Sequence, residues 1–386
     1  MLVETLLYGV SIGSVLLIAA LGLAIVFGLM GVINLAHGEL MMLGAYTTFV
    51  VQNVFRGFGD TFFDFYIIAA IPCAFAVAAI AGIILERGVI RFLYGRPLET
   101  LLATWGVSLV LRQFVRSVNW SLSISIIVFS VLFFGGMWFF SRQTNWEQIR
   151  TKFIGITLPV TIAIAIVTGI LINNSGNNAL TNKWFSARNV DVTAPGWLRG
   201  GLPIGAFQFP NIRLFIIILT ILCLVSVYLF LNKSDWGLKI RSVTQNRTMS
   251  ACLGIPTATV DMLTFALGSG LAGIAGVGIS FLGSVGPNTG QNYIVDAFMV
   301  VVVGGVGNLL GTIIAALSIG IISYLFESNT IGVLLTAQNP PDFILDIVNF
   351  FATTTMAKVL VFILIIAFLQ VKPAGIFPPK GRTAEL

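Results

Sequence analysis

Runs of about 20 apolar residues recur along this chain, and the first of them covers residues 5–30. A helix of that length crosses the roughly 30 Å hydrocarbon core of a bilayer. The runs show no alternation of apolar and polar residues, so they favour helices over the strands of a membrane barrel. Only 9% of the residues are charged, against roughly 25% in soluble domains. We therefore expect an all-α, polytopic integral membrane protein with a single domain over residues 1–386.

Basic residues concentrate in loops between these runs. They form four groups: Arg87, Arg91 and Arg96; Arg142, Arg150 and Lys152; Lys233, Lys239, Arg241 and Arg247; Lys372, Lys380 and Arg382. Cytoplasmic loops of membrane proteins carry an excess of Lys and Arg, so we assign these loops to the cytoplasm. The same rule explains the net charge of +6 without a nucleic-acid partner. Alternation then places the N-terminus outside, the C-terminus inside, and residues 173–212 in an external loop.

One long apolar run, residues 294–325, must turn once if the tail is to reach the cytoplasm. The stretch after it, residues 327–346, has three acidic residues and no Lys or Arg, which is typical of an external loop. The turn is expected at GGVGN, residues 304–308. Its first limb, residues 294–303, is then only about 15 Å long as a helix, and such a limb must be covered by protein or line a wet cavity.

The predicted crossings number about 9–11, and some of them are broken or re-entrant. The least regular is residues 98–118, which carry two arginines near their far end. This segment either crosses while its arginines snorkel to the interface or enters the membrane without crossing it.

The densest polar stretch is residues 232–256. Asp235 is expected to cap a helix over residues 236–245, and Thr248 a second short helix that ends at Gly254. The bases of this stretch could serve only to anchor the chain by positive charge. Anchoring requires no capped helices, so we favour a docking element for a cytoplasmic partner.

Two polar interruptions offer hydrogen-bonding groups near the apolar runs. GVINLAHGE, residues 31–39, is a broken helix whose side chains satisfy freed backbone groups, a polar waist in a solute path, or both. GPNTGQN, residues 286–292, is explained by loop chemistry alone or as an outer mouth that receives a solute. The candidate residues of a substrate path are Asn34, His37, Glu39, Thr104, Asn288, Asn292, Asp296 and Asn308.

No pattern of catalytic or metal-binding residues is present in the sequence. The one histidine, His37, has no Cys or His partners at zinc-site spacing. The P-loop pattern GxxxxGK[ST] is missing, so the chain does not hydrolyse ATP by that route. A membrane-embedded enzyme would need clustered ionisable residues within its spans. We therefore expect a transport subunit and not an enzyme.

Three parts of the chain resemble the permease subunits of branched-chain amino-acid type ABC importers. They are GLAIVFGLMGVINLAHGELMMLGAY, GLKIRSVTQN together with ACLGI, and AFMVVVVGGVGNLLGT. Within that family, RPLETLLATWGVSLVLRQ, residues 96–113, resembles the urea-transporter subgroup. The resemblance implies a multi-pass protein of the bacterial plasma (inner) membrane. Its partners would be a second related permease, two cytoplasmic ATPases that use ATP and Mg, and an external solute-binding protein, with no cofactor on this chain.

The resemblance also assigns roles to residues. It makes residues 232–256 the cytoplasmic coupling loop that contacts the ATPase, and its coupling residues are Gly237, Lys239, Arg241, Gln245, Asn246, Ala251 and Gly254. It places Asn34, His37 and Glu39 on the N-terminal signature of the family.

Three functions follow as alternatives. The first is a urea permease, because urea is small, neutral and strongly hydrated, and its path should offer hydrogen bonds and little charge. The second is a branched-chain amino-acid or amide permease of the same build, although a zwitterion would more naturally need paired charges or helix ends. The third is an autonomous channel or a membrane enzyme.

Overall fold

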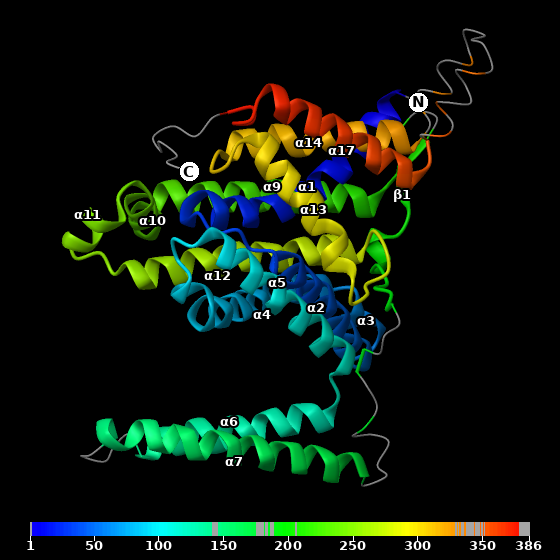
Figure 1. Cartoon of the computed structure of the whole chain (residues 1–386). Coiled ribbons are helices and arrows are strands. Elements are labelled where there is room, and N and C mark those ends of the chain that lie inside the picture. The colour runs from blue at the N-terminus through cyan, green and yellow to red at the C-terminus, as the bar shows by residue number, and fades with distance from the viewer. Residues whose placement is uncertain are drawn as a thin grey trace. The chain divides into compact units, whose positions relative to one another are not determined.

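The computed structural model is almost entirely helical, as the apolar runs predict (Figure 1). Its contacts divide the chain into two units, residues 1–109 with 190–386, and residues 110–189. The residues that the structure describes are 2–140, 146–174, 181, 184–185, 189–204, 207–328, 330, 332, 336, 343, 348, 350 and 352–377. Most of the predicted external stretch 327–346 and three predicted cytoplasmic bases, Arg142, Lys380 and Arg382, lie outside them.

The larger unit holds most of the helices. In chain order they are α1 (Leu2–Met30), α2 (His37–Gly57), α3 (Asp60–Phe63), α4 (Tyr66–Gly88), the 3-10 turns η1 (Ile90–Phe92) and η2 (Gly196–Leu198), α9 (Asn211–Lys233), α10 (Asp235–Gln245), α11 (Arg247–Cys252), α12 (Thr257–Ser280), α13 (Thr289–Gly304), α14 (Leu309–Glu327) and α17 (Thr354–Val371). The division between the units falls within α5 (Pro97–Ser117).

Seven helices in the described part are long and apolar enough to cross a membrane: α1, α4, α6, α7, α9, α12 and α14. A total of about 9–11 crossings requires, in addition, helices that are shorter or more polar: α2, α5, α13 and α17. The all-α polytopic class is therefore confirmed, while the face of the membrane at which each end lies stays a prediction.

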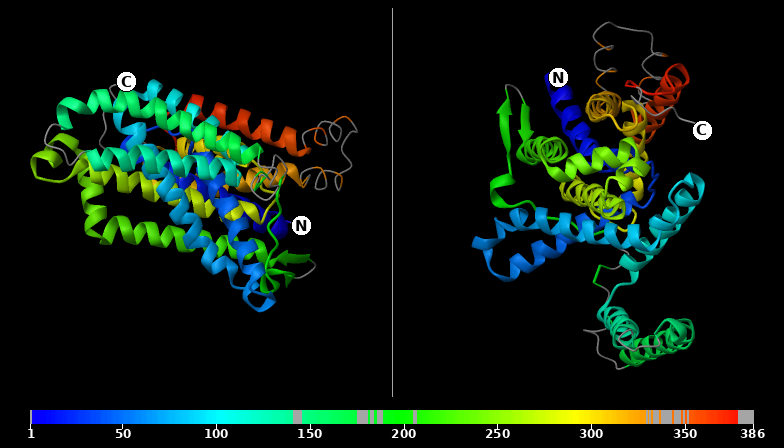
Figure 2. Two further views of the ribbon diagram at one scale, coloured as in Figure 1. Left: turned by 90° about the horizontal axis from the view of Figure 1, so that it is seen from below. Right: turned by 90° about the vertical axis from the view of Figure 1, so that its left-hand side faces the viewer.

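A short β-hairpin interrupts the predicted loop 173–212. It pairs β1 (Gly201–Ile204) with β2 (Phe207–Pro210) in antiparallel register, with Leu202 opposite Phe209. Alternating apolar residues in LPI and FQF suit a half-buried strand pair, and Phe209 is buried. The hairpin leads directly into α9, as Figure 2 shows in green.

The core of the larger unit is built around α1 and α12. In the most apolar stretch of each helix, 83% of the residues of α1 and 78% of those of α12 are buried. These shares are far larger than in the other candidate spans of the described part. Small residues permit the close packing that membrane helices need. A Cβ atom on Gly44 of α2 would collide with the backbone of Gly273 in α12, and one on Gly276 would collide with the carbonyl oxygen of Met41.

The predicted break after the first apolar run is present. α1 ends at Met30, and Gly31 has a positive φ of 68°. The chain then turns back along α1. His37 is the first residue of α2, and its Nε2 bonds to the carbonyl oxygen of Ala19 at 3.0 Å. Ala19 lies about 17 Å before Met30 along the helix at ~1.5 Å per residue. α2 therefore begins beside the middle of α1.

The predicted turn at residues 304–308 is also present. Gly305 and Gly307 adopt positive φ angles of 98° and 84°, and the Asn308 side chain caps α14 by accepting from the backbone N–H of Leu310 and Gly311 at 3.1 and 3.2 Å. A Cβ atom on Gly28 would collide with Gly307. The turn therefore lies against the end of α1.

The first limb of this hairpin is longer than predicted. α13 begins at Thr289 and not at residue 294, and it contains 16 residues, or about 24 Å of helix. The prediction was wrong because it counted only apolar residues. The polar residues Gln291 and Asn292 are helical, and their backbone N–H groups donate to the carbonyl oxygen of Asn288.

The smaller unit contains α6 (Trp120–Phe140) and α7 (Trp146–Asn174), which pack against each other. The Ser121 hydroxyl donates to the carbonyl oxygen of Gly169 at 3.1 Å. In the most apolar stretch of each helix, 0% of the residues of α6 and 6% of those of α7 are buried. Their apolar side chains are therefore mostly exposed within the described residues.

Candidate functional site

Two capped helices form the predicted coupling loop. The Ser234 hydroxyl accepts from the backbone N–H of Gly237 at 3.0 Å and starts α10, and the Asn246 side chain accepts from Met249 at 2.9 Å and starts α11. The predicted caps Asp235 and Thr248 were therefore wrong. Ser234 and Asn246 have the extended backbone that an N-cap requires, whereas Asp235 and Thr248 are helical.

The end of α11 agrees with the prediction. Gly254 has a positive φ of 81°, its N–H donates to the carbonyl oxygen of Ala251 at 3.0 Å, and that of Ile255 donates to Ser250 at 3.1 Å. These two bonds make a Schellman motif, which needs a residue without a Cβ atom at the left-handed position.

The predicted coupling residues divide into a buried part and an exposed part. Gly237 is buried where α10 meets the end of α9, and a Cβ atom there would collide with the carbonyl oxygens of Phe230 and Leu231. The exposed members are Arg241, Gln245, Asn246, Ala251 and Gly254, and Lys239 is half-buried.

Apolar side chains accompany these polar residues on the same two helices. Leu238, Met249 and Leu253 are 59%, 58% and 76% exposed. The Lys239 ammonium lies 4.5 Å from the centre of the Trp236 ring. Exposed apolar groups beside basic ones are typical of a protein-binding surface. We call α10 and α11 together the coupling helices.

The coupling helices contact the end of α1. Leu29 lines an open depression together with Leu238 and Arg241, and the neighbouring Gly28 meets Gly307 of the α13–α14 turn. The coupling helices, the end of α1 and the glycine turn therefore share one end of the larger unit. The cytoplasmic turn predicted for residues 304–308 requires this arrangement.

An ionic contact that the sequence analysis did not find fastens α11 to α12. Arg247 Nη2 lies 2.5 Å from Asp261 Oδ2, and the guanidinium lies 4.9 Å from the centre of the Tyr94 ring. Tyr94 donates in turn to Glu86 Oε1 at 3.4 Å. Burial, followed by the charge of Asp261, raises the pKa of Tyr94, so the phenol keeps its proton for that bond. The sequence did offer one signal for this contact, because Asp261 lies within an apolar run and an acidic residue there is expected to have a partner.

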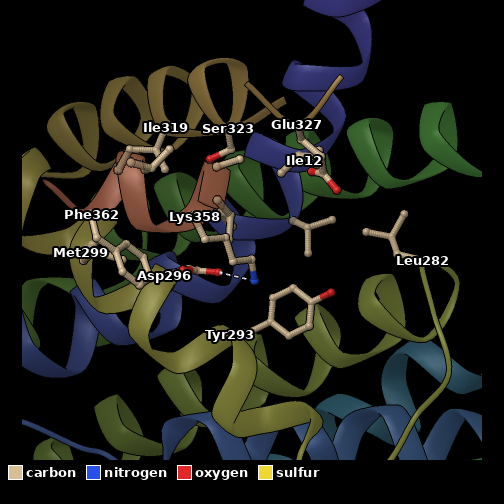
Figure 3. A pocket seen from close by; sticks show the side chains of 14 residues that line it. Ile12, Leu282, Tyr293, Asp296, Met299, Ile319, Ser323, Glu327, Lys358 and Phe362 are labelled. Atoms are coloured by element: carbon tan, nitrogen blue, oxygen red, sulfur yellow. Dashed lines mark ion pairs between the residues drawn. The ribbon is translucent and has the colours of Figure 1, made fainter. Parts of the chain in front are cut away.

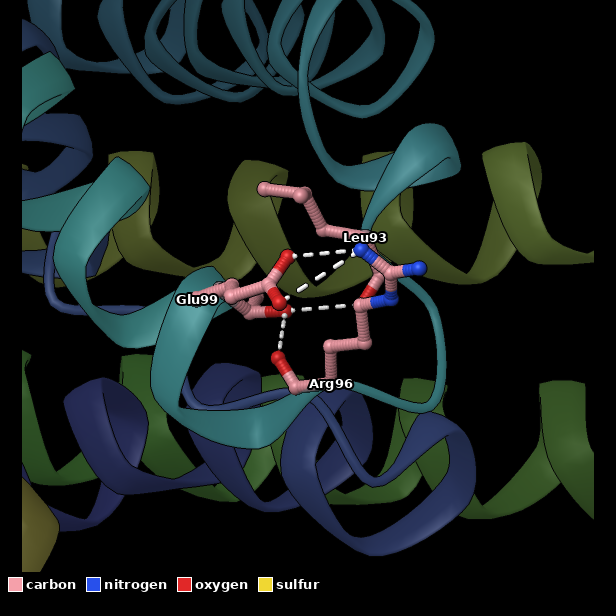
Figure 4. A network of polar contacts seen from close by, with 4 residues as sticks. Leu93, Arg96 and Glu99 are labelled. Atoms are coloured by element: carbon pink, nitrogen blue, oxygen red, sulfur yellow. Dashed lines mark hydrogen bonds and ion pairs between the residues drawn. The ribbon is translucent and has the colours of Figure 1, made fainter.

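The segment that resembles the urea subgroup begins beside this contact. Arg96 pairs with Glu99 at 3.1 Å, and the Thr100 hydroxyl donates to the carbonyl oxygens of Leu93 and Arg96 at 3.0 and 2.8 Å (Figure 4). Both charged side chains are more than half exposed, so the pair itself adds little stability. The bond from Thr100 to Leu93 joins the first turn of α5 to the residue before Tyr94.

The polar break brings four predicted path residues together. The Asn34 side chain accepts from the backbone N–H of Ala36 at 3.0 Å, the Thr104 hydroxyl accepts from that of Leu35 at 3.2 Å, and His37 bonds to Ala19. Glu39 accepts from the hydroxyl of Ser108 at 3.0 Å. The sequence analysis did not include Ser108. The Asn34 and Thr104 side chains thus satisfy backbone N–H groups freed by the break, as the broken-helix interpretation predicts.

The Asn34 and His37 side chains of this buried cluster each keep one polar atom without a hydrogen-bond partner among the described residues. The atoms are Asn34 Nδ2 and His37 Nδ1, on side chains that are 1% and 0% exposed. The amide Nδ2 is a donor. Because His37 Nε2 must donate to the Ala19 carbonyl, Nδ1 of the neutral ring is an acceptor.

The remaining predicted path residues do not gather at one place. Gly290 packs on Gly38, so the starts of α13 and α2 touch, and Asn288 precedes that contact. Asp296 Oδ2 lies 3.7 Å from Lys358 Nζ on α17. Asn308 lies at the opposite end of α13, in the glycine turn.

Asp296 and Lys358 face a cavity of about 250 Å³ among α1, α13, α14 and α17 (Figure 3). Tyr293, Ser323 and Glu327 supply further polar groups to its wall. The rest of the lining is apolar.

Comparison with known proteins identifies the family. The profile described as "Branched-chain amino acid transport system / permease component" matches residues 5–369. The high-affinity branched-chain amino acid transport system permease protein LivH of Escherichia coli (strain K12) is 25% identical over 315 residues, which cover 81% of this chain and 82% of LivH. The corresponding protein BraD of Pseudomonas aeruginosa is 24% identical over 321 residues, 82% of this chain and 84% of BraD.

A shorter match extends to another import system. The autoinducer 2 import system permease protein LsrD of Photorhabdus laumondii is 29% identical over 132 residues, 31% of this chain and 40% of LsrD. No solved structure matches the chain. Subunits of this family bind no cofactor themselves, are not catalytic, and imply an ATPase, a second permease and a binding protein as partners. The chain belongs to the branched-chain amino acid transport system permease family and is a multi-pass membrane permease component of a bacterial ABC importer.

Proposed function

We propose that this permease forms, with a second related permease, the membrane pathway for urea. An external binding protein delivers the solute, and two cytoplasmic ATPases that dock on the coupling helices drive its movement. The segment that resembles the urea subgroup, residues 96–113, supplies Thr104 and Ser108 to the polar break.

One observation carries the choice of solute. The polar break keeps one buried donor, Asn34 Nδ2, and one buried acceptor, His37 Nδ1, without partners among the described residues. Urea offers a carbonyl oxygen to the donor and N–H groups to the acceptor, and it brings no charge into the membrane interior. A solute that satisfies both atoms removes the cost of leaving buried polar groups unpaired, roughly 1–3 kcal/mol for each group.

The docking proposal depends on the coupling helices. A side-chain cap satisfies a backbone N–H group at the start of each helix, and both helices expose apolar and basic side chains at the end of α1. A helix pair seated in an ATPase cleft converts closure of the ATPases into rigid-body movement of the spans. Its predicted coupling residues remain Gly237, Lys239, Arg241, Gln245, Asn246, Ala251 and Gly254. The buried Gly237 lets α10 pack on the end of α9, and the others are exposed or half-buried.

A branched-chain amino acid is the second candidate, and two observations favour it. LivH and BraD are named for branched-chain amino acid transport. The Asp296–Lys358 pair in the cavity also supplies the paired charges that a zwitterion would need.

Reconstitution in proteoliposomes with all partners tests both candidates. We expect ATP-dependent uptake of labelled urea that excess leucine does not reduce. Uptake of leucine, with no uptake of urea, would establish the second candidate in its place. Flux of urea through the purified chain alone, without ATPases, would contradict the ABC mechanism.

A further inference from the structure

The ion pair in the cavity is looser than a structural salt bridge. Lys358 Nζ lies 3.7 Å from Asp296 Oδ2, whereas charge-assisted N–H···O bonds are about 2.7–2.9 Å long. The Lys358 side chain is 53% exposed and that of Asp296 is 15% exposed. At 3.7 Å the two groups make no charge-assisted hydrogen bond, so a ligand that enters between them breaks no such bond.

The carboxylate nevertheless needs donors. The Asp296 side chain is largely buried away from water. A desolvated anion is stable only when it is well hydrogen-bonded. Tyr293 and Ser323 line the same space and offer hydroxyl groups that can donate or accept (Figure 3). The cavity thus offers an acceptor beside a donor, with an apolar wall that includes Ile12 and Phe362.

We propose that this cavity is a solute-binding site separate from the polar break. It takes a small molecule that carries an N–H group and an oxygen acceptor on the same carbon framework. The N–H group donates to Asp296, and the oxygen accepts from Lys358. Urea and the head group of an amino acid share this chemistry. The transported molecule is taken from the proposed function, so that part of the inference rests on it.

The cavity lies close to the polar break. Its α1 residues, Ile12 to Leu16, lie about one to two turns from Ala19, to which His37 bonds. Gly38 at the start of α2 packs on Gly290 and Ile294 of α13, the helix that also carries Asp296. The two sites therefore meet through the first turns of α2 and α13.

Solute binding to the purified complex, without the binding protein, tests this proposal. Asp296→Asn and Lys358→Met should each weaken binding of labelled urea, or of labelled leucine, at least about tenfold. Asp191→Asn removes an exposed carboxylate from the loop before the β-hairpin and should bind as the wild type does. The solute that binds identifies which source of the shared chemistry is used.

A second measurement does not depend on charge-removing variants. Ser323→Cys, with Cys73 and Cys252 replaced by serine because both are exposed, places a thiol in the cavity wall. Bound solute should slow its reaction with a methanethiosulfonate reagent several-fold. It should not slow the reaction of Ser242→Cys, on α10 at the other end of α1.

The outcomes separate the two levels of the argument. A wild-type complex that transports neither solute would overturn the proposed function. Normal binding by both charge variants, or no protection of Ser323→Cys in a complex that transports, would overturn the cavity site and leave the proposed function standing.

Discussion

Arg247 fastens the start of α11 to α12, and its replacement should cost more than replacement of its partner. Arg247→Gln removes the guanidinium beside Asp261 and over Tyr94. The Asp261 side chain is only 5% exposed, while that of Arg247 is 49% exposed. Loss of the arginine therefore leaves a buried carboxylate without its cation. Loss of the acid leaves a cation that already reaches water.

The two exposed fractions set the magnitudes. Breaking a fully buried pair costs about 3–5 kcal/mol, and an exposed pair is worth roughly 0–1 kcal/mol. For this half-exposed pair we expect Arg247→Gln to lower the free energy of unfolding by about 2 kcal/mol. Asp261→Asn should lower it by about 1 kcal/mol or less. The double variant should be less destabilised than the sum of the two, since neither charge remains.

Denaturant titration of the complex in detergent measures these differences, with Lys233→Gln as a control that removes an exposed base from the end of α9. In proteoliposomes, Arg247→Gln should keep ATP hydrolysis and lose most solute uptake, because α11 can then move without α12. Equal costs for the two single variants, together with an additive double variant, would refute the reasoning.

Three further predictions follow from other parts of the larger unit. Arg241→Glu should abolish ATP-coupled uptake while membrane insertion, measured by fractionation, stays normal; full uptake would count against docking on α10. Gly276→Ala should lower the unfolding free energy by about 1–3 kcal/mol, because its Cβ atom would collide with Met41, whereas Gly278→Ala in the same helix has open space and should not. A cysteine at Asn308 should react with impermeant reagents from the cytoplasmic side, and labelling from outside alone would contradict the predicted turn.

Helices, breaks and turns could be predicted because their signals are local. Continuous apolar runs give the spans, and GVINLAHGE and GGVGN interrupt them where the structure does. The side assigned to residues 304–308 required charge counts from distant loops and stays a prediction. The contact of Gly28 with Gly307 shows that the turn lies at the same end as the end of α1.

Exact helix starts were less predictable. Ser234 and Asp235 are both good capping residues, and the direction in which the chain leaves α9 decides between them. The start of α13 was missed because its first residues are polar. Thr289 is buried there, whereas Gln291 and Asn292 are helical but exposed.

The two ionic contacts could not be predicted, since each joins residues from different helices. Arg247 and Asp261 belong to α11 and α12, and Asp296 and Lys358 belong to α13 and α17. Hydropathy shows that a charge lies in an apolar run, but it does not show which charge it meets. The buried Ser108 beside Glu39 was missed for the same reason.

The bonds that complete α13 impose an order on the assembly of the membrane domain. Ile376 donates its N–H to the carbonyl oxygen of Val303 at 2.8 Å, and Phe377 donates to that of Gly304 at 3.4 Å. These acceptors belong to the last turn of a helix, where carbonyl groups lack intrahelical partners. The residues that satisfy them are synthesised about seventy positions later, and chains fold from the N-terminus as they emerge. During synthesis, the last carbonyl groups of α13 therefore lack these two protein donors until the residues after α17 have been made.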